Sequence, residues 1–315
     1  MLGPEHVGRR VAVRIRLANP EPGRRFTDVT GELIEMGPAF WRVLPDSVAH
    51  SGTAVTIDAS AVVAARAIPP KPTPFSEILE LERHLAATWP APETAELGGW
   101  LLRYAEGFSR RANSVLALTA PPGGTDAALA AVGDWYEARG ARPLIALPGG
   151  VGKRLDDELA ARGWEAEGRT AVMTKRLDGA SQDSTAYDGE AVVVDAPGAA
   201  LLEQVGRGAP AVAARIFGSG PGRGYAEIHR GGELAARGRG AVEGDLVAIT
   251  NIGTLPAFRR QGLGTEILRA LEAWGHGNGA RRAALQVEAD NEAAIAMYER
   301  LGYAERYRYQ YRARS

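Results

Sequence analysis

Apolar and polar residues alternate along residues 7–68 of the chain. The clearest stretch carries Val11, Val13, Ile15 and Leu17, and further short apolar runs lie around Leu33 and within residues 41–44, 55–57 and 62–68. A period of two residues is typical of strands with one buried face. We therefore predict a small all-β domain over residues 1–70, with an SH3-like barrel as its fold.

A proline-rich segment at residues 68–75 interrupts this pattern and predicts a stiff linker. Beyond it, the apolar positions follow a period of 3.6 residues as far as Pro90, which is typical of an amphipathic helix. Ser76 is the predicted N-cap of that helix.

Strand and helix patterns alternate through the rest of the chain. Residues 100–176 predict strand, strand, helix, strand, helix and strand, and the polar residues 178–190 predict a linker. After two short helices the scheme returns as a hairpin, a strand ending at Thr254, a helix from about Gly264, a strand at 283–287, a helix after Asn291 and a closing strand. We predict two α/β domains, residues 71–180 and 190–315.

The two α/β schemes superpose without a gap at a shift of 139 residues. Trp135 then meets Trp274, and the run Gly140-Ala141-Arg142 meets Gly279-Ala280-Arg281. This common register indicates an internal duplication, although helix-ending glycines recur in unrelated α/β halves as well. The first copy carries Ala120, Thr125, Gly152 and Leu159 where the second carries Arg259, Gly264, Asn291 and Tyr298, so it has lost whatever chemistry those groups perform.

Composition narrows the function classes. The chain has 315 residues, 45% of them apolar, a net charge of −1 and no cysteine. Bulk nucleic-acid or anionic-membrane binding is therefore not expected, and thiolate metal sites are excluded. No apolar run reaches the length of a membrane span, the first residues do not resemble a signal peptide, and the five histidines lack a metal-ligand spacing. We expect a cytoplasmic protein without a metal.

The segment "LPAFRRQGLGTEIL", residues 255–268, carries the main candidate chemistry. The first N–H groups of a helix attract an anion, and Gly262 and Gly264 let a phosphate approach the backbone where a Cβ would block it. Arg259 and Arg260 add charge-assisted donors. The pattern predicts a pyrophosphate site at a strand-to-helix crossover, and a plain loop with two glycines is the alternative.

These residues carry a family resemblance. Arg259-x-x-Gly262-x-Gly264, together with "LQVEADNEAAIAMYERLGY" at residues 285–303, resembles the acetyl-CoA site of the GCN5-related N-acetyltransferases (GNAT) over roughly residues 190–315. The resemblance implies tandem GNAT folds with a degenerate first copy, and acetyl-CoA as cosubstrate. The wider layout, with its N-terminal barrel and "GGWLLRYAEGFSRRANSV" in the first copy, is similar to an actinobacterial group described as N-acetylglutamate synthases.

By this resemblance, the pantetheine arm pairs along Ile252, Gly253 and Thr254. The pyrophosphate loop would comprise Arg259, Arg260, Gln261, Gly262, Leu263, Gly264 and Thr265. Asn291 has two interpretations, helix N-cap and polar contact to the pantetheine.

A neutral amine attacks the thioester in this family, and no covalent enzyme intermediate is needed. The resemblance makes Tyr298 the acid that protonates the departing thiolate, with a packed core tyrosine as the alternative. Relatives that acetylate N-terminal amines place a glutamate where this chain has Gln286, which cannot take a proton. Glu288, two residues on along the same strand face, is the nearest substitute base, with Glu243 or a water behind it, and it is equally explained as a solvated residue.

The acceptor is expected in a pocket that faces the degenerate copy. Arg110 or Arg111 could bind a carboxylate bidentately, with Asn113 or Ser114 adding a hydrogen bond, unless the arginines are solvated or paired internally. This favours the α-amine of L-glutamate as the acceptor. The alternatives are a peptide or protein amine, a polyamine, or a non-catalytic protein that senses CoA. The sequence does not give the oligomeric state.

Overall fold

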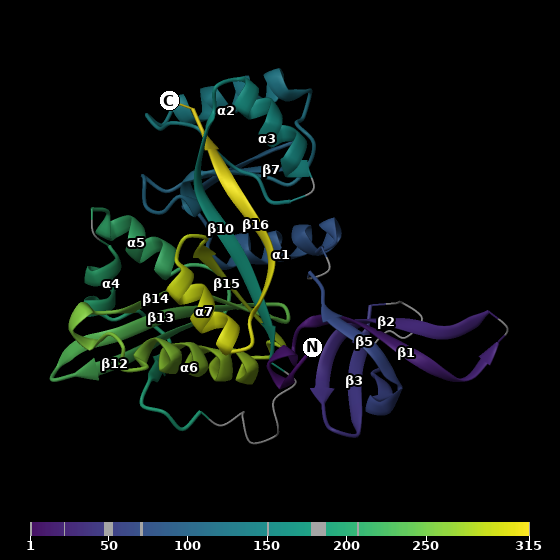
Figure 1. Cartoon of the computed structure of the whole chain (residues 1–315). Coiled ribbons are helices and arrows are strands. Elements are labelled where there is room, and N and C mark those ends of the chain that lie inside the picture. Colours follow the sequence, from purple (N-terminus) through teal and green to yellow (C-terminus); the bar gives the residue numbers. More distant parts are fainter. Residues whose placement is uncertain are drawn as a thin grey trace. The chain divides into compact units, whose positions relative to one another are not determined.

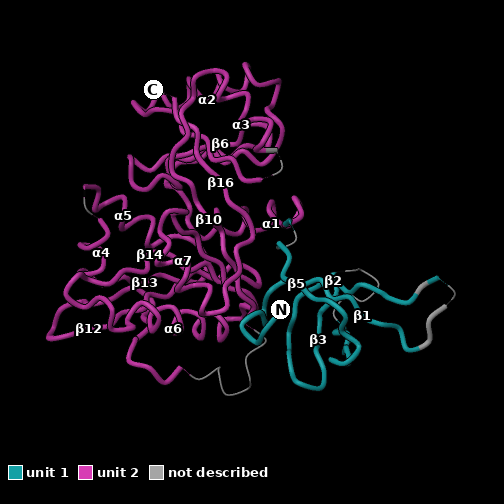
Figure 2. Tube along the Cα trace, viewed as in Figure 1, with its two compact units in different colours: residues 1–72 teal, residues 73–315 magenta. Residues whose placement is uncertain are grey.

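The computed structural model describes residues 2–21, 23–46, 53–69, 72–149, 151–177, 187–206 and 208–314. The chain divides into two compact units, Met1–Pro72 and Thr73–Ser315 (Figure 2). Most of the predicted 178–190 linker, and residues 70 and 71 of the proline-rich segment, lie outside the described residues. Within the described ranges, no helix is both long and apolar enough to cross a membrane.

The first unit is an all-β domain, as its alternating pattern predicts. After a 3-10 turn η1 (Pro4–His6) come β1 (Arg10–Glu21), β2 (Arg24–Met36), β3 (Phe40–Pro45), β4 (Val55–Asp58), the turn η3 (Ala59–Ala61) and β5 (Val62–Ala67). The strands form one antiparallel sheet in the order β4-β3-β2-β1-β5, around a core that includes Val11, Val13, Leu33 and Val43. Among the described residues no pairing joins β4 to β5, so the predicted barrel is an open sheet here.

The second unit begins with helix α1 (Phe75–Thr88), which buries Ile78, Leu81 and Leu85. Pro74 rather than Ser76 occupies the N-cap position, so the predicted cap is wrong. The reason is that Pro74 already ends the extended linker and fixes the backbone for the first turn, which leaves Ser76 inside the helix.

Two successive copies of one scheme build an eleven-stranded sheet in the second unit. The first copy comprises β6 (Glu93–Leu97), β7 (Trp100–Tyr104), the turn η4 (Arg111–Asn113), β8 (Val115–Ala117), α2 (Thr125–Glu137), β9 (Leu144–Ala146), α3 (Val151–Ala161) and β10 (Glu165–Arg176). The second comprises β11 (Val192–Val194), α4 (Ala199–Val205), α5 (Pro210–Phe217), β12 (Arg223–Arg230), β13 (Glu233–Glu243), β14 (Leu246–Thr254), the turn η6 (Pro256–Phe258), α6 (Leu263–Gly277), β15 (Arg282–Glu288), α7 (Glu292–Arg300) and β16 (Ala304–Ala313).

The 139-residue shift predicted from the sequence lays α2 on α6, β9 on β15, α3 on α7 and β10 on β16. Each copy has its own core: α2 packs with Trp100, Ile145 and Trp164 in the first, and α6 packs with Leu285 and Tyr303 in the second. A third apolar cluster, which includes Leu116, Val172 and Leu246, joins strands of both copies.

The copies exchange their last strands. β10 of the first copy lies between β15 and β16, and β16 of the second copy lies between β10 and β9. Figure 1 shows β10 and β16 side by side. β10 pairs antiparallel with β15 from Thr170↔Glu288 to Arg176↔Arg282, and β16 pairs with β9 through Tyr311↔Ala146. The two copies are therefore one continuous sheet rather than two separate domains in sequence.

Candidate functional site

A fork between β14 and β15 lies at the centre of the second copy. The two parallel strands pair only from Leu246↔Arg282 to Ile249↔Leu285, although β14 continues to Thr254 and β15 to Glu288. The register of β13 and β14 shifts opposite this point, and Asn251 has a positive φ of 56°. Such a bulge bends the strand, so β14 leaves its neighbour and its backbone groups become available to an extended ligand.

The predicted pyrophosphate loop follows β14. Arg260 and Gly262 have positive φ angles of 63° and 81°, and Gly262 is the N-cap of α6. A Cβ placed on Gly264 would lie 3.8 Å from Thr254 Oγ1 and 4.0 Å from Met297 Sδ, so a methyl group there would not clash within the protein. The first N–H groups of α6 have no intrahelical partner, and the residues just before the helix, 259–262, are exposed, so an anion can reach this helix start.

The predicted loop residues differ in exposure. Arg259, Arg260, Gln261 and Gly262 are exposed, Gly264 and Thr265 are half-buried, and Leu263 is buried in the core. Leu263 can therefore contribute only its backbone N–H to a cofactor.

Helix α7 carries Asn291 and Tyr298. The Asn291 side chain accepts a hydrogen bond from the N–H of Ala294 at 3.1 Å, which makes it the N-cap of α7. Tyr298 is 9% exposed, and burial raises the pKa of its hydroxyl. No group among the described residues hydrogen-bonds to that hydroxyl, so Tyr298 holds a proton at neutral pH that no other side chain engages.

A cavity of about 740 Å³ opens at the fork, between the two copies. Its second-copy lining includes Thr250, Gln286 and Glu288 from the fork strands and Tyr309 and Tyr311 from β16. Its first-copy lining is Trp89 together with residues 106–111 and Thr170. The cavity thus contains Arg110, Arg111, Gln286 and Glu288, residues far apart in sequence that we singled out for the acceptor.

The two arginines differ in their partners. Arg110 forms an ion pair with Glu288, and its guanidinium lies 5.8 Å from the ring centroid of Tyr311. Arg111 lies 5.8 Å from the ring centroid of Trp89, and within the described chain no carboxylate is in ion-pair contact with it. Arg111 is therefore the guanidinium that remains available to a ligand.

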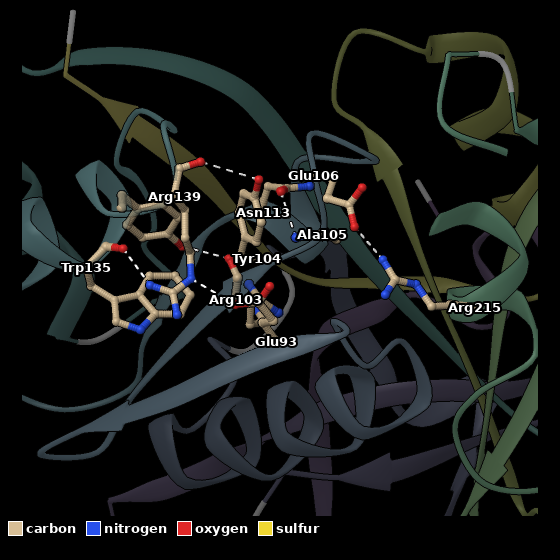
Figure 3. A network of polar contacts seen from close by, with 10 residues as sticks. Glu93, Arg103, Tyr104, Ala105, Glu106, Asn113, Trp135, Arg139 and Arg215 are labelled. Carbon is tan, nitrogen blue, oxygen red and sulfur yellow. Dashed lines mark hydrogen bonds and ion pairs between the residues drawn. The ribbon is translucent and has the colours of Figure 1, made fainter. Parts of the chain in front are cut away.

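Asn113 shapes the loop that carries these arginines. Its Oδ1 accepts from the N–H groups of Ala105 and Gly107 at 2.9 and 3.0 Å, and its Nδ2 donates to the carbonyls of Phe108 and Ser109. Figure 3 shows the contact of Asn113 with Ala105 and, nearby, the ion pair of Glu106 with Arg215 of α5. With its amide engaged four times, Asn113 positions the loop, whereas we had expected it to contact the substrate.

Ser114, the alternative donor, is also engaged within the protein. It is fully buried, and its hydroxyl accepts a hydrogen bond from the buried Arg103 at 2.9 Å. Glu243, the reserve base, lies at the end of β13 and is not among the residues that line the cavity.

Several cavity residues escaped the sequence analysis. Arg237 donates from Nη1 to the carbonyl of Asn251 at 2.7 Å and from Nε to Gln204 Oε1 at 2.9 Å, which fixes the bulge to α4. A pair of arginines, Arg237 and Arg239, in the middle of a small and apolar run was the available signal for Arg237, and an asparagine inside the strand pattern of β14 was the signal for the bulge. Trp89, at the C-cap of α1, gave no comparable signal.

In the first copy, the position that matches the start of α6 makes contacts within the chain. The hydroxyl of Thr125, at the start of α2, donates to the carboxylate of Glu158, which also accepts from Arg154 Nε at 3.0 Å. The helix start thus faces a carboxylate of its own chain. Leu159, in the place of Tyr298, is fully buried. No group of three or more His, Cys, Asp or Glu side chains in either copy could hold a metal, as far as the described residues extend.

Two family models match the chain. Residues 75–312 match the model described as "Probable histone acetyltransferase Rv0428c C-terminal", and residues 5–66 match "Rv0428c N-terminal Sm-like domain". The relative named "Uncharacterized N-acetyltransferase YobR", from Bacillus subtilis (strain 168), is 28% identical over 238 residues, which are 73% of this chain and 96% of the relative.

Solved structures share the fold over about three quarters of the chain. A GCN5-related N-acetyltransferase from Kribbella flavida has a TM-score of 0.57 at 18% identity and covers 75% of this chain and 95% of its own. A "Tandem GNAT protein from the clavulanic acid biosynthesis pathway (without AcCoA)" has a TM-score of 0.51 at 17% identity and covers 79% and 89%.

Proposed function

We propose that this chain transfers the acetyl group of acetyl-CoA to an amine at the β14–β15 fork. The chain belongs to the family described as "Probable histone acetyltransferase Rv0428c C-terminal" and is of GNAT type. One observation supports this proposal above all. The fork, the start of α6 and Tyr298 occur together in the second copy, whereas in the first copy Thr125 at the matching helix start donates to Glu158, and the buried Leu159 replaces the tyrosine.

Acetyl-CoA would lie along the fork. Its pantetheine arm would pair with the backbone of Ile252, Gly253 and Thr254, and its pyrophosphate would lie against the first N–H groups of α6. Arg259 and Arg260 would add charge-assisted contacts to the phosphates. The cap role of Asn291 leaves its amide N–H groups to donate to the pantetheine.

In the reaction, the lone pair of a neutral amine attacks the thioester carbonyl and forms a tetrahedral oxyanion. Backbone N–H groups of β14 stabilise that oxyanion. Collapse breaks the C–S bond, Tyr298 gives its proton to the leaving thiolate, and the amine nitrogen loses a proton, so that an amide and CoA leave. Burial raises the pKa of the Tyr298 hydroxyl, so this group carries its proton at neutral pH.

Glu288 is the proposed acceptor of the amine proton. It ends β15 at the cavity, and Arg110 holds its carboxylate there. Gln286 is in the place where relatives carry a base, but an amide side chain cannot accept the proton. Arg110, Arg111 and Arg237 surround the cavity. Their positive charges lower the pKa of a bound amine, so a larger fraction of the amine is neutral before it reacts.

We propose a small amine that carries a carboxylate as the acceptor, with the α-amine of L-glutamate as the first candidate. Arg111 would bind that carboxylate, because its guanidinium lies at the cavity and forms no ion pair at contact distance among the described residues, although the buried Glu82 also attracts it. The excess of arginine also disfavours polyamines. The description of the family model supports the second candidate, an amine of a protein. We place the reaction in the cytoplasm.

The test is a screen of acceptors by release of free CoA. The full chain is incubated with acetyl-CoA and, separately, with L-glutamate, other amino acids, short peptides and a polyamine. Rapid release with L-glutamate supports the full proposal, and release only with peptides or a polyamine removes the glutamate assignment. If acetyl-CoA binds but no amine releases CoA, the chain is a CoA-binding protein instead of an enzyme.

A further inference from the structure

At the point where β14 and β15 separate, which we call the crotch of the fork, two polar side chains each have one atom without a hydrogen bond among the described residues. Thr250 and Gln286 are the first residues beyond the last β14–β15 pair, Ile249↔Leu285, and both line the cavity. Thr250 is 9% exposed, and its Oγ1 is buried without a hydrogen bond among the described residues. Gln286 Oε1 is likewise buried and unpaired.

The second end of the Gln286 amide is already engaged. Its Nε2 donates to the hydroxyl of Tyr309 at 3.3 Å, and the Tyr309 hydroxyl lies 3.3 Å from that of Tyr311. Exchanging the two ends of the amide would only change which atom stays unpaired. The crotch therefore retains one unpaired amide atom and one unpaired hydroxyl, side by side on neighbouring strands.

Unpaired buried polar atoms are costly and rare in folded proteins, so two of them in one place indicate an absent partner. That partner must fit where two strands separate, and it must offer hydrogen-bond donors. A neutral primary amine has two N–H groups and one lone pair. Two acceptors at the crotch would engage both N–H groups and leave the lone pair free for the thioester.

We infer that Thr250 and Gln286 hold the attacking nitrogen of the acceptor through these two atoms, as positioning residues for a primary amine. The inference rests on the proposed transfer from acetyl-CoA. The inference explains why Gln286 can stand where relatives carry a glutamate. To orient the amine, Gln286 needs only to accept a hydrogen bond, while Glu288 is the proposed acceptor of the proton. The inference also separates substrates, since a secondary amine has one N–H and leaves one acceptor empty.

Thr250→Val tests the hydroxyl, because it keeps the shape of the side chain and removes only the unpaired group. We expect unchanged or higher thermal stability and an unchanged Kd for acetyl-CoA. The kcat/KM for the primary amine should fall about tenfold or more, because the variant loses at least one hydrogen bond to the amine. Thr250→Ser is the matched control, since it retains the hydroxyl and should restore most of the activity. The preference for a primary amine over its N-methyl derivative should shrink in Thr250→Val and persist in Thr250→Ser.

A crystal structure of the full chain with CoA tests the inference independently of any acceptor. We expect an ordered water within hydrogen-bond distance of Thr250 Oγ1 and of the Gln286 amide, standing in for the amine nitrogen. If no ordered water lies there, or if the Thr250 hydroxyl forms a hydrogen bond with the pantetheine, the inference is overturned, whatever amine the enzyme acetylates. Equal activity of Thr250→Val and wild type would overturn it as well. In contrast, a wild-type protein that acetylates no amine contradicts the proposed function.

Discussion

Gly264→Ala separates folding from cofactor binding at the start of α6. In the protein alone, the new methyl carbon would lie 3.8 Å from Thr254 Oγ1 and 4.0 Å from Ile252 Cγ2 and Met297 Sδ, which are ordinary van der Waals distances. Replacing a helical glycine by alanine at an unstrained position stabilises a protein by about 0.4–1 kcal/mol. For a unit of this size we expect a Tm about 1–4 °C higher.

The same methyl group would stand where a phosphate must approach the helix N–H groups. Losing one hydrogen bond to a charged group costs about 1.5–3 kcal/mol, so the Kd for acetyl-CoA should rise about 10- to 100-fold. Gly264→Val adds two further carbons and should abolish binding. Isothermal titration and thermal denaturation of the same samples measure the two effects.

Gly277→Ala is the matched control in the same helix. No atom lies within 4 Å of a Cβ placed there, and Gly277 is far from the fork end of α6. The control should raise stability without changing the Kd for acetyl-CoA. If Gly264→Ala binds acetyl-CoA as tightly as wild type, the anion site at the start of α6 is refuted.

Four further outcomes are expected. Tyr298→Phe should lower kcat by about 10²- to 10⁴-fold with Kd for acetyl-CoA within a few fold, and wild-type turnover would make Tyr298 a core residue only. Calorimetry should find one acetyl-CoA per chain, whereas two would show that the first copy also binds. Arg111→Ala should raise KM for L-glutamate well above its effect on acetyl-CoA, and equal effects would remove Arg111 from the acceptor site. Glu82→Gln should raise Tm at pH 8 more than at pH 4. Burial raises the pKa of the Glu82 carboxyl above its usual 4.5, so ionisation of this group with rising pH lowers the stability of the wild-type protein, whereas glutamine stays neutral and still accepts from the Tyr307 hydroxyl. An equal change of Tm at both pH values would contradict this.

Local patterns in the sequence predicted most of the elements. The register shared by Trp135 and Trp274 identified the repeat, and the two glycines with Arg259 located the start of α6, because these features depend on residues close in the chain. The exchange of β10 and β16 was not predicted, since alternation identifies a strand but not its neighbour in the sheet.

The residues that line the cavity were harder to predict than the loop before α6. Arg110 and Glu288 form an ion pair across 178 positions, which no spacing rule connects. The unpaired state of Thr250 depends on a bulge one residue later and on how far β15 continues beside β14. Such features arise from pairing between distant segments, and they become visible only once the sheet is assembled.

The strand exchange makes the duplication difficult to reverse in evolution. Thr170 and Val172 of the first copy pair with Glu288 and Gln286 of the second, so deleting the first copy would remove the neighbouring strand from β15, which carries two of the proposed site residues. It would also expose the edge of β15 to pairing with other chains. Once two copies had exchanged strands in this way, one of them could lose its site residues by mutation, but its polypeptide could no longer be deleted without disrupting the other copy.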